Sequence, residues 1–206
     1  MTARLGDMSD DELLERFATG DAAAFGVLLG RYQTPLFNFI ARSVRDTDAA
    51  ADLLQDVFTR VIQHSEGFNR TSKFSTWLYA IARNLCIDHA RRMTHRRHAS
   101  LDTAGPNGSG DGALAPWVER VALEQPEVDS KAASGPLRNR IAQAIEALPE
   151  DQREVFLMRQ LQHMPFADIA QVVGVSENTV KSRMRYALER LQEALAEFEE
   201  HARAEA

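Results

Sequence analysis

Two short stretches of the chain carry side chains suited to binding nucleic acid. In the first, polar and charged residues recur at spacings that place them on the outer face of one helix: Ser176, Glu177, Asn178, Lys181, Ser182 and Arg185. Groups of these kinds can read base edges in the major groove and neutralise phosphates. Each lysine or arginine, taken alone, is also what an ordinary solvated helix face carries.

The second stretch is basic and aromatic. Residues 64–98 carry seven basic and two acidic side chains, although the whole chain has a net charge of −6. We expect one ring and several arginines to lie away from the core: Tyr79, Arg83, Arg91, Arg92 and Arg96. Stacking surfaces beside a cationic track suit unpaired bases and their phosphates. Phe74 and Trp77 share an apolar spacing with Ile81, which favours a place in the core.

No residue set predicts catalysis or a metal site. The chain has no Gly-rich phosphate loop, no nucleophile elbow and no acid–base pair at a plausible spacing. His89, His95 and His98 alternate with arginines at spacings that suit chelation poorly. The single cysteine, Cys86, cannot form an internal disulfide, and we expect its thiol in the core. We therefore expect a non-enzymatic protein without metal or cofactor.

A helix-turn-helix pattern over residues 166–185 positions the first stretch. Ala170 is small where two helices would cross, and Gly174 suits a turn that needs a positive φ. Ser176 is a natural N-cap for the second helix. The angle between the helices would be filled by Ile169, Val173, Val175 and Val180. An ordinary helical hairpin with a glycine turn is the alternative.

The remaining sequence predicts an all-α fold of two small helical domains, at residues 10–98 and 137–198. Between them, residues 99–136 hold five of the 11 glycines and four of the 7 prolines, which predicts a flexible linker with one helical turn at 117–123. A linker of that length would span roughly 31–37 Å. Helices are expected to begin at a Ser9–Glu12 capping box, at Asp21, at Thr47 or Asp48, and at Ser72.

The N-terminal residues argue against export. They are acidic and lack the apolar core of a signal peptide. No run of about 18 apolar residues could span a membrane. These features predict a cytoplasmic protein that does not insert into a membrane.

In several motifs the chain resembles bacterial sigma factors of the sigma-70 family, specifically the ECF (extracytoplasmic function) group. Residues 52–58 are similar to its region 2.2 helix, and residues 74–84 and 88–92 to its promoter-melting helix. Residues 148–156 and 174–183 are similar to region 4. The motifs occur in the family's order and cover nearly everything outside the linker.

The resemblance implies a function and a set of contacts. Such a protein binds core RNA polymerase and directs it to promoters through −10 and −35 elements. Four residues would dock on the clamp helices of the β′ subunit: Asp52, Gln55, Asp56 and Phe58. Asn84, Arg91, Arg92 and Arg96 would engage the −10 element, and the helix-turn-helix face would read the −35 element. The β flap would be a second docking site, and an anti-sigma protein a further partner.

Two other functions are compatible with parts of the sequence. An autonomous helix-turn-helix regulator would bind a palindromic operator as a dimer, but it has no use for the aromatic and basic stretch. A protein-binding helical adaptor leaves both basic surfaces unexplained. We expect little promoter binding by the free protein, because two weak DNA-binding modules need a scaffold to act together.

Overall fold

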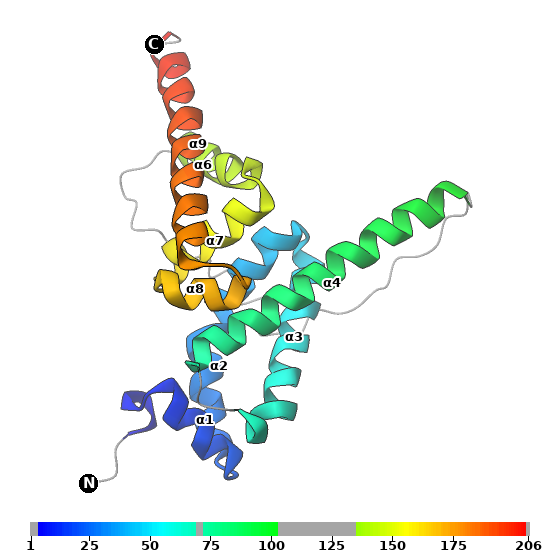
Figure 1. Cartoon of the computed structure of the whole chain (residues 1–206), viewed down its shortest axis with the longest axis vertical. Coiled ribbons are helices and arrows are strands. Elements are labelled where there is room, and N and C mark those ends of the chain that lie inside the picture. The colour runs from blue at the N-terminus through cyan, green and yellow to red at the C-terminus, as the bar shows by residue number, and fades with distance from the viewer. Residues whose placement is uncertain (1–3, 69–71, 103–134, 205–206) are drawn as a thin grey trace. The chain divides into compact units, whose positions relative to one another are not determined.

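The computed structural model describes residues 4–68, 72–102 and 135–204, and within these ranges it contains eight α-helices, two 3-10 helices and no strand (Figure 1). The helices fall into two compact units divided between residues 125 and 126. The expected all-α class is therefore confirmed. Most of the expected linker, residues 103–134 with the helical turn at 117–123, lies outside the described residues.

The first unit contains four α-helices: α1 (Asp10–Ala18), α2 (Ala22–Val44), α3 (Thr47–His64) and α4 (Phe74–Asp102). Short 3-10 helices lie at Leu5–Asp7 and Ser65–Gly67. Helix α2 is central and contacts α1, α3 and α4. The fully buried residues of the shared core include Leu14, Leu28, Ile40, Leu54 and Leu78.

Two of the expected helix starts are confirmed. The Glu12 amide donates to the Ser9 hydroxyl while the Ser9 amide donates to the Glu12 carboxylate, which completes the capping box. The Asp21 carboxylate accepts from the Ala23 amide at 3.1 Å. Such caps depend on residues close in sequence, so the pattern alone could find them.

The third expected start is also confirmed, and the fourth differs. Helix α3 begins at Thr47, where the Asp46 carboxylate caps it by accepting from two amides of the first turn. Helix α4 begins at Phe74, two residues after Ser72. The Phe74 amide donates to the carboxylate of Asp11 on α1 at 2.9 Å. A residue of another helix therefore takes the place that Ser72 was expected to fill.

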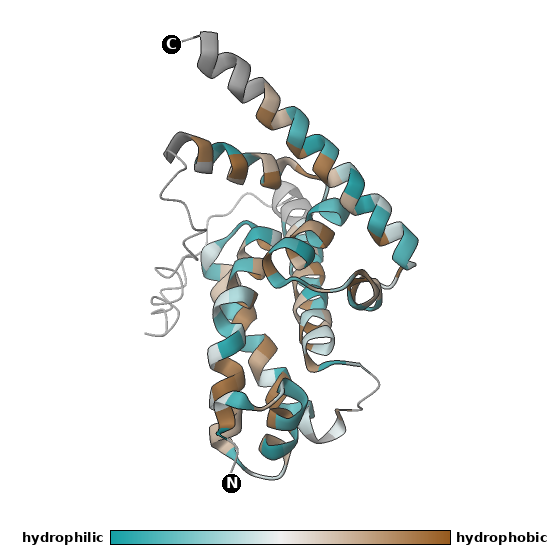
Figure 2. Cartoon of the chain, turned by 90° about the vertical axis from the view of Figure 1, so that its left-hand side faces the viewer, coloured by the Kyte–Doolittle hydropathy of each residue, from teal (hydrophilic) through white to brown (hydrophobic). Residues whose placement is uncertain are grey.

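The second unit consists of α6 (Gly135–Ala147), α7 (Glu150–Gln162), α8 (Phe166–Val173) and α9 (Glu177–Ala204). Helix α9 contacts each of the other three. Apolar and polar residues occur together on these helices, as in amphipathic helices that share a core (Figure 2). The buried core residues include Leu148, Val155, Met158, Ile169, Val180 and Ala187.

A buried arginine joins α6 to α7. Arg153 is only 5% exposed. Its guanidinium donates to the carbonyl of Glu146 at 3.1 Å and to that of Leu148 at 3.2 Å. The last carbonyls of a helix lack partners within the helix, so this side chain satisfies acceptors that the end of α6 would otherwise leave open.

Candidate nucleic-acid interface

The helix-turn-helix is formed by α8, the turn at Gly174 and the start of α9. Gly174 has φ 76° and ends α8, with its amide donating to the Ala170 carbonyl at 2.9 Å. Ile169 and Val180 are fully buried between the helices. The expected motif is therefore confirmed, and a positive φ is the reason that glycine stands at the turn.

All six residues expected on the outer face of this motif are exposed: Ser176, Glu177, Asn178, Lys181, Ser182 and Arg185. Ser176 also caps α9, because its hydroxyl accepts from the Thr179 amide at 3.2 Å and contacts the Thr179 hydroxyl. The side-chain amide of Asn178 takes no part in this cap. Asn178 is therefore well suited to contact a base edge, whereas Ser176 already serves the helix start.

Both cations of this face are paired with glutamates one turn away. Lys181 lies 2.7 Å from the carboxylate of Glu177, and Arg185 lies 3.4 Å from that of Glu189. The Arg185 guanidinium also lies 4.6 Å from the centre of the Tyr186 ring. A DNA phosphate must therefore compete with a carboxylate for each cation. Exposed pairs of this kind contribute only about 0.3–0.5 kcal/mol, so phosphates can displace them.

Arg183 has a different role from its basic neighbours. It forms ion pairs with Asp151 at 3.2 Å and with Glu154 at 3.6 Å, and its side chain is 23% exposed. Both carboxylates belong to α7. Arg183 therefore fixes the recognition helix on the rest of the second unit and is not part of the DNA-facing set.

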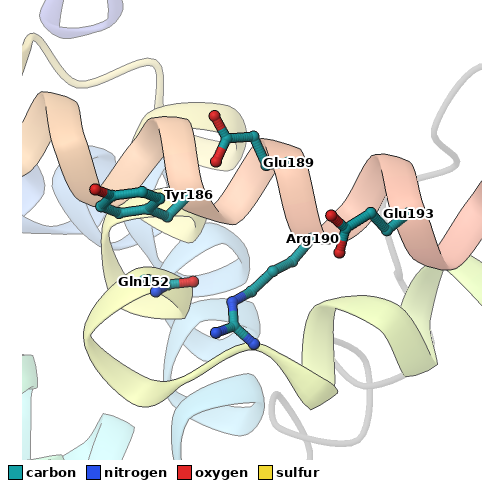
Figure 3. Close-up of a pocket in the computed structure, with 5 residues that line it drawn as sticks. All are labelled: Gln152, Tyr186, Glu189, Arg190 and Glu193. Atoms are coloured by element: carbon teal, nitrogen blue, oxygen red, sulfur yellow. The ribbon is translucent and has the colours of Figure 1, made fainter.

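A hollow of about 510 Å³ lies beside this face, between α9 and α7. Tyr186, Glu189, Arg190 and Glu193 line it from α9, and Gln152 lines it from α7 (Figure 3). The Arg190 side chain extends toward the turn that joins α6 to α7 (Figure 3). Because Glu189 also pairs with Arg185, the hollow borders the expected DNA-binding face.

Four residues expected at the −10 element are exposed on α4: Asn84, Arg91, Arg92 and Arg96. Arg83 is half-buried. Arg91 has one weak ion pair, 3.9 Å from Asp88. The exposed surface of α4 therefore carries three of the expected cations.

Tyr79 is not one of the exposed residues of α4. Its side chain is 1% exposed, and its ring packs edge-on against Phe39 at 5.3 Å. Burial raises the pKa of Tyr79 well above its ordinary value. The expectation that Tyr79 stacks on a base is wrong, because α2 and α3 both pack on α4 and bury a wider face than one apolar stripe predicts.

The residues expected to contact polymerase divide in the same way. Asp52, Gln55 and Asp56 are exposed on α3, but Phe58 is 6% exposed and packs edge-on against Phe25. The structure corrects the assignment of Phe58 to a docking surface: it is a core residue.

The exposed acids of α3 face the cations of α4 across a groove of about 230 Å³. Asp52 and Asp56 line one side of this groove. Its other side carries His89, Arg92, Met93 and Arg96. Two residues of each expected set, separated by some 40 residues of sequence, therefore border one groove of the first unit.

Two aromatic residues of the basic and aromatic stretch form a pair that the sequence did not predict. The rings of Phe68 and Trp77 lie 5.1 Å apart, and both side chains are only half-buried. The apolar spacing of Trp77 predicted a core position, which is correct for Phe74 but not fully for Trp77. The aromatic type of both residues was the available signal.

In the described part of the chain, no cluster of histidine, cysteine or acidic residues could hold a metal ion. The side chain of His98 lies outside that part. No helix of the described residues is both long and apolar enough to span a membrane.

Comparison with known proteins agrees with this geometry. Residues 28–97 match the family model of sigma-70 region 2, and residues 138–191 match that of sigma-70 region 4. The ECF RNA polymerase sigma-E factor of Escherichia coli K12 is 31% identical over 179 residues, covering 86% of this chain and 89% of that protein. The chain belongs to the ECF group of the sigma-70 family.

Further relatives of this ECF sigma factor extend the match. The RNA polymerase sigma-H factor of Pseudomonas aeruginosa is 32% identical over 189 residues, covering 90% of this chain and 93% of its own. The solved structure of the sigma factor RpoE with the anti-sigma factor NepR from Bartonella quintana is similar in fold, with a TM-score of 0.61 and 26% identity. It covers 84% of this chain and 96% of its own.

Like other ECF sigma factors, this protein binds core RNA polymerase, directs it to promoters through −10 and −35 elements and helps to initiate transcription. It is not an enzyme. The comparisons give no support to an autonomous regulator that binds a palindromic operator.

Proposed function

We propose that each unit of this sigma factor reads one promoter element. Asn178, Lys181 and Arg185 of α9 contact the −35 element as a duplex. Asn84, Arg91, Arg92 and Arg96 of α4 hold the unpaired strand of the −10 element. The observation that carries this proposal is the presence of one exposed, cation-bearing helix face on each unit.

The test is transcription in vitro with the purified protein, sigma-free core polymerase and a library of upstream regions. We expect transcript starts that depend on the protein and share two motifs at a fixed spacing. The free protein alone should protect neither motif at 150 mM salt, because polymerase supplies the effective concentration. Protection of a palindrome by the free protein, without dependent starts, would contradict the proposal.

We further infer that the exposed acids of α3 dock on the clamp helices of the β′ subunit, and that the second unit docks on the β flap. Asp52, Gln55 and Asp56 support the first contact because they are exposed on one helix. Core binding would then place their carboxylates against a basic partner.

Charge reversal tests the α3 contact. The double variant Asp52→Lys/Asp56→Lys should weaken binding to core polymerase about tenfold, since two attractive pairs become repulsive and exposed pairs contribute up to about 1 kcal/mol each. Fluorescence anisotropy of labelled protein against core measures it. Gln63→Lys, on an exposed position near the end of the same helix, should leave the affinity unchanged. Equal loss in both variants would show a general charge effect instead.

An anti-sigma protein is a proposed partner, and the bacterial cytoplasm the proposed location. Large apolar side chains are exposed on both units: Ile62, Met93, Ile141, Tyr186 and Leu188. Where such side chains gather into a contiguous patch, the surface is typical of a docking site. In a pull-down from unstressed native cells we expect a second, non-polymerase protein bound to this one. Recovery of polymerase subunits alone under every condition would contradict this proposal.

A further inference from the structure

The first turn of α4 is held by the carboxylate of a residue on α1, near the N-terminus of the first unit. The Phe74 amide donates to Asp11 at 2.9 Å, across 63 residues of sequence, in a partly buried contact. A free amide at a helix start is electropositive, so a carboxylate is a strong partner for it. Asp11 stands in the first turn of α1 and therefore links α1 directly to the start of α4.

The neighbouring Asp10 fixes the same region through a side chain. Its carboxylate accepts from Arg31 at 2.6 Å and from the Tyr32 hydroxyl at 2.5 Å. The Tyr32 ring in turn meets the Phe74 ring edge-on at 5.4 Å. Burial, followed by the hydrogen bond to Asp10, raises the pKa of Tyr32, so its hydroxyl keeps the proton that it donates. Phe74 is thus fixed at both its backbone and its ring.

Phe74 then supports the half-buried pair of rings formed by Phe68 and Trp77. Its ring, 1% exposed, lies 6.1 Å from that of Trp77, which packs against Phe68. Trp77 is half-buried in the first turn of α4, the helix that also carries Asn84 and the exposed arginines. Phe68, also half-buried, directly follows the 3-10 helix Ser65–Gly67. The position of this pair therefore depends on contacts that Asp11 makes to the first turn of α4.

We propose that Asp11 is a positioning residue for promoter melting: it fixes the first turn of α4 so that the Phe68–Trp77 pair meets the unpaired −10 strand. The inference rests on the proposed role of α4. Asp11 acts through Phe74 and need not contact DNA. Its negative charge would by itself disfavour DNA, so a loss of strand binding on its removal cannot come from electrostatic repulsion.

The test uses the full-length protein with Trp117→Phe, so that Trp77 is the single tryptophan. The variants are Asp11→Ala, Asp11→Asn, whose amide oxygen can still accept the hydrogen bond, and Asp7→Ala. The last removes a nearby exposed carboxylate as a matched control. The first measurement is the emission of Trp77 in the free protein. We expect a red shift in Asp11→Ala and none in Asp11→Asn or Asp7→Ala.

The second measurement is the affinity of the holoenzyme for a single-stranded oligonucleotide that carries the −10 motif mapped by transcription. Asp11→Ala should weaken it about fivefold to tenfold, which is within the usual net contribution of one hydrogen bond. Asp11→Asn should stay within about twofold of the wild type. Affinities for core polymerase and for the −35 duplex should not change.

Three results would overturn the inference. Equal losses in strand, duplex and core binding would make Asp11 a purely structural residue. If Asp11→Ala leaves the affinity for the single-stranded oligonucleotide unchanged, Asp11 has no role in promoter melting, whether or not the Trp77 emission shifts. If the wild type gives no starts that depend on a −10 motif, the proposed function itself fails, and a Trp77 shift would then show a structural contact only.

Discussion

Replacement of Arg153 by alanine should strongly destabilise the second unit and leave the stability of the first unchanged. The guanidinium is buried and donates to the carbonyls of Glu146 and Leu148. Its removal leaves both acceptors open and creates a cavity beside the end of α6. Buried groups left without partners cost about 1–3 kcal/mol each. We expect a loss of about 2–4 kcal/mol, which is large against the stability of a small helical unit.

Hydrogen exchange read by region measures this effect. Amides of α6 to α9 should lose protection in Arg153→Ala, whereas those of α1 to α4 should not, because the two units have separate cores. Arg185→Ala provides the matched control, since that arginine is exposed on the same unit and its loss should change stability by less than about 0.5 kcal/mol. Uniform loss of protection across both units would contradict the assignment of Arg153 to the second unit alone.

Replacement of Asn178 by alanine should remove sequence discrimination at the −35 element. Asn178 is exposed near the start of the recognition helix and is not committed to a cap. An amide that contacts a base edge with two hydrogen bonds contributes about 1–3 kcal/mol of discrimination. The holoenzyme should therefore bind its promoter about 5- to 150-fold more weakly, with unchanged binding to a duplex whose −35 motif is scrambled.

Lys181→Ala separates base reading from phosphate contact. A phosphate contact acts on every DNA sequence alike, so this variant should lower the affinity for the promoter and for the scrambled duplex by the same factor. The affinity for both duplexes should also depend less steeply on salt concentration. Competition binding of the holoenzyme at two salt concentrations distinguishes the variants. Equal losses on both duplexes in Asn178→Ala would show that this side chain does not read bases.

The features predicted correctly from the sequence are those set by neighbouring residues. The turn at Gly174 needs a positive φ, the Ser9–Glu12 box is closed within four residues, and the face of α9 follows from helical spacing around Val180. The family resemblance supplied the order of regions in the same way, from local motifs. Each of these could be recognised before any contact between helices was known.

What the sequence did not predict depends on contacts between helices. Tyr79 is buried because α4 packs against two helices rather than one. Phe58 reaches Phe25 on another helix, and Arg183 is bound to two acids of α7. The Asp11–Phe74 contact joins positions 63 residues apart. Spacing within one helix carries no information on its partner, so these roles required the three-dimensional arrangement.

The Asp11–Phe74 contact also sets an order of events during synthesis. Ribosomes add about 5–20 residues per second, so roughly 3 to 13 s separate the appearance of the carboxylate from that of the amide it accepts. Throughout that interval the Asp11 carboxylate has been synthesised but its partner amide has not. Contacts of high sequence separation must also overcome loop-closure entropy. The segment proposed to meet promoter DNA is therefore fixed late, after α2 and α3 have been made, and a nascent chain cannot complete this site early.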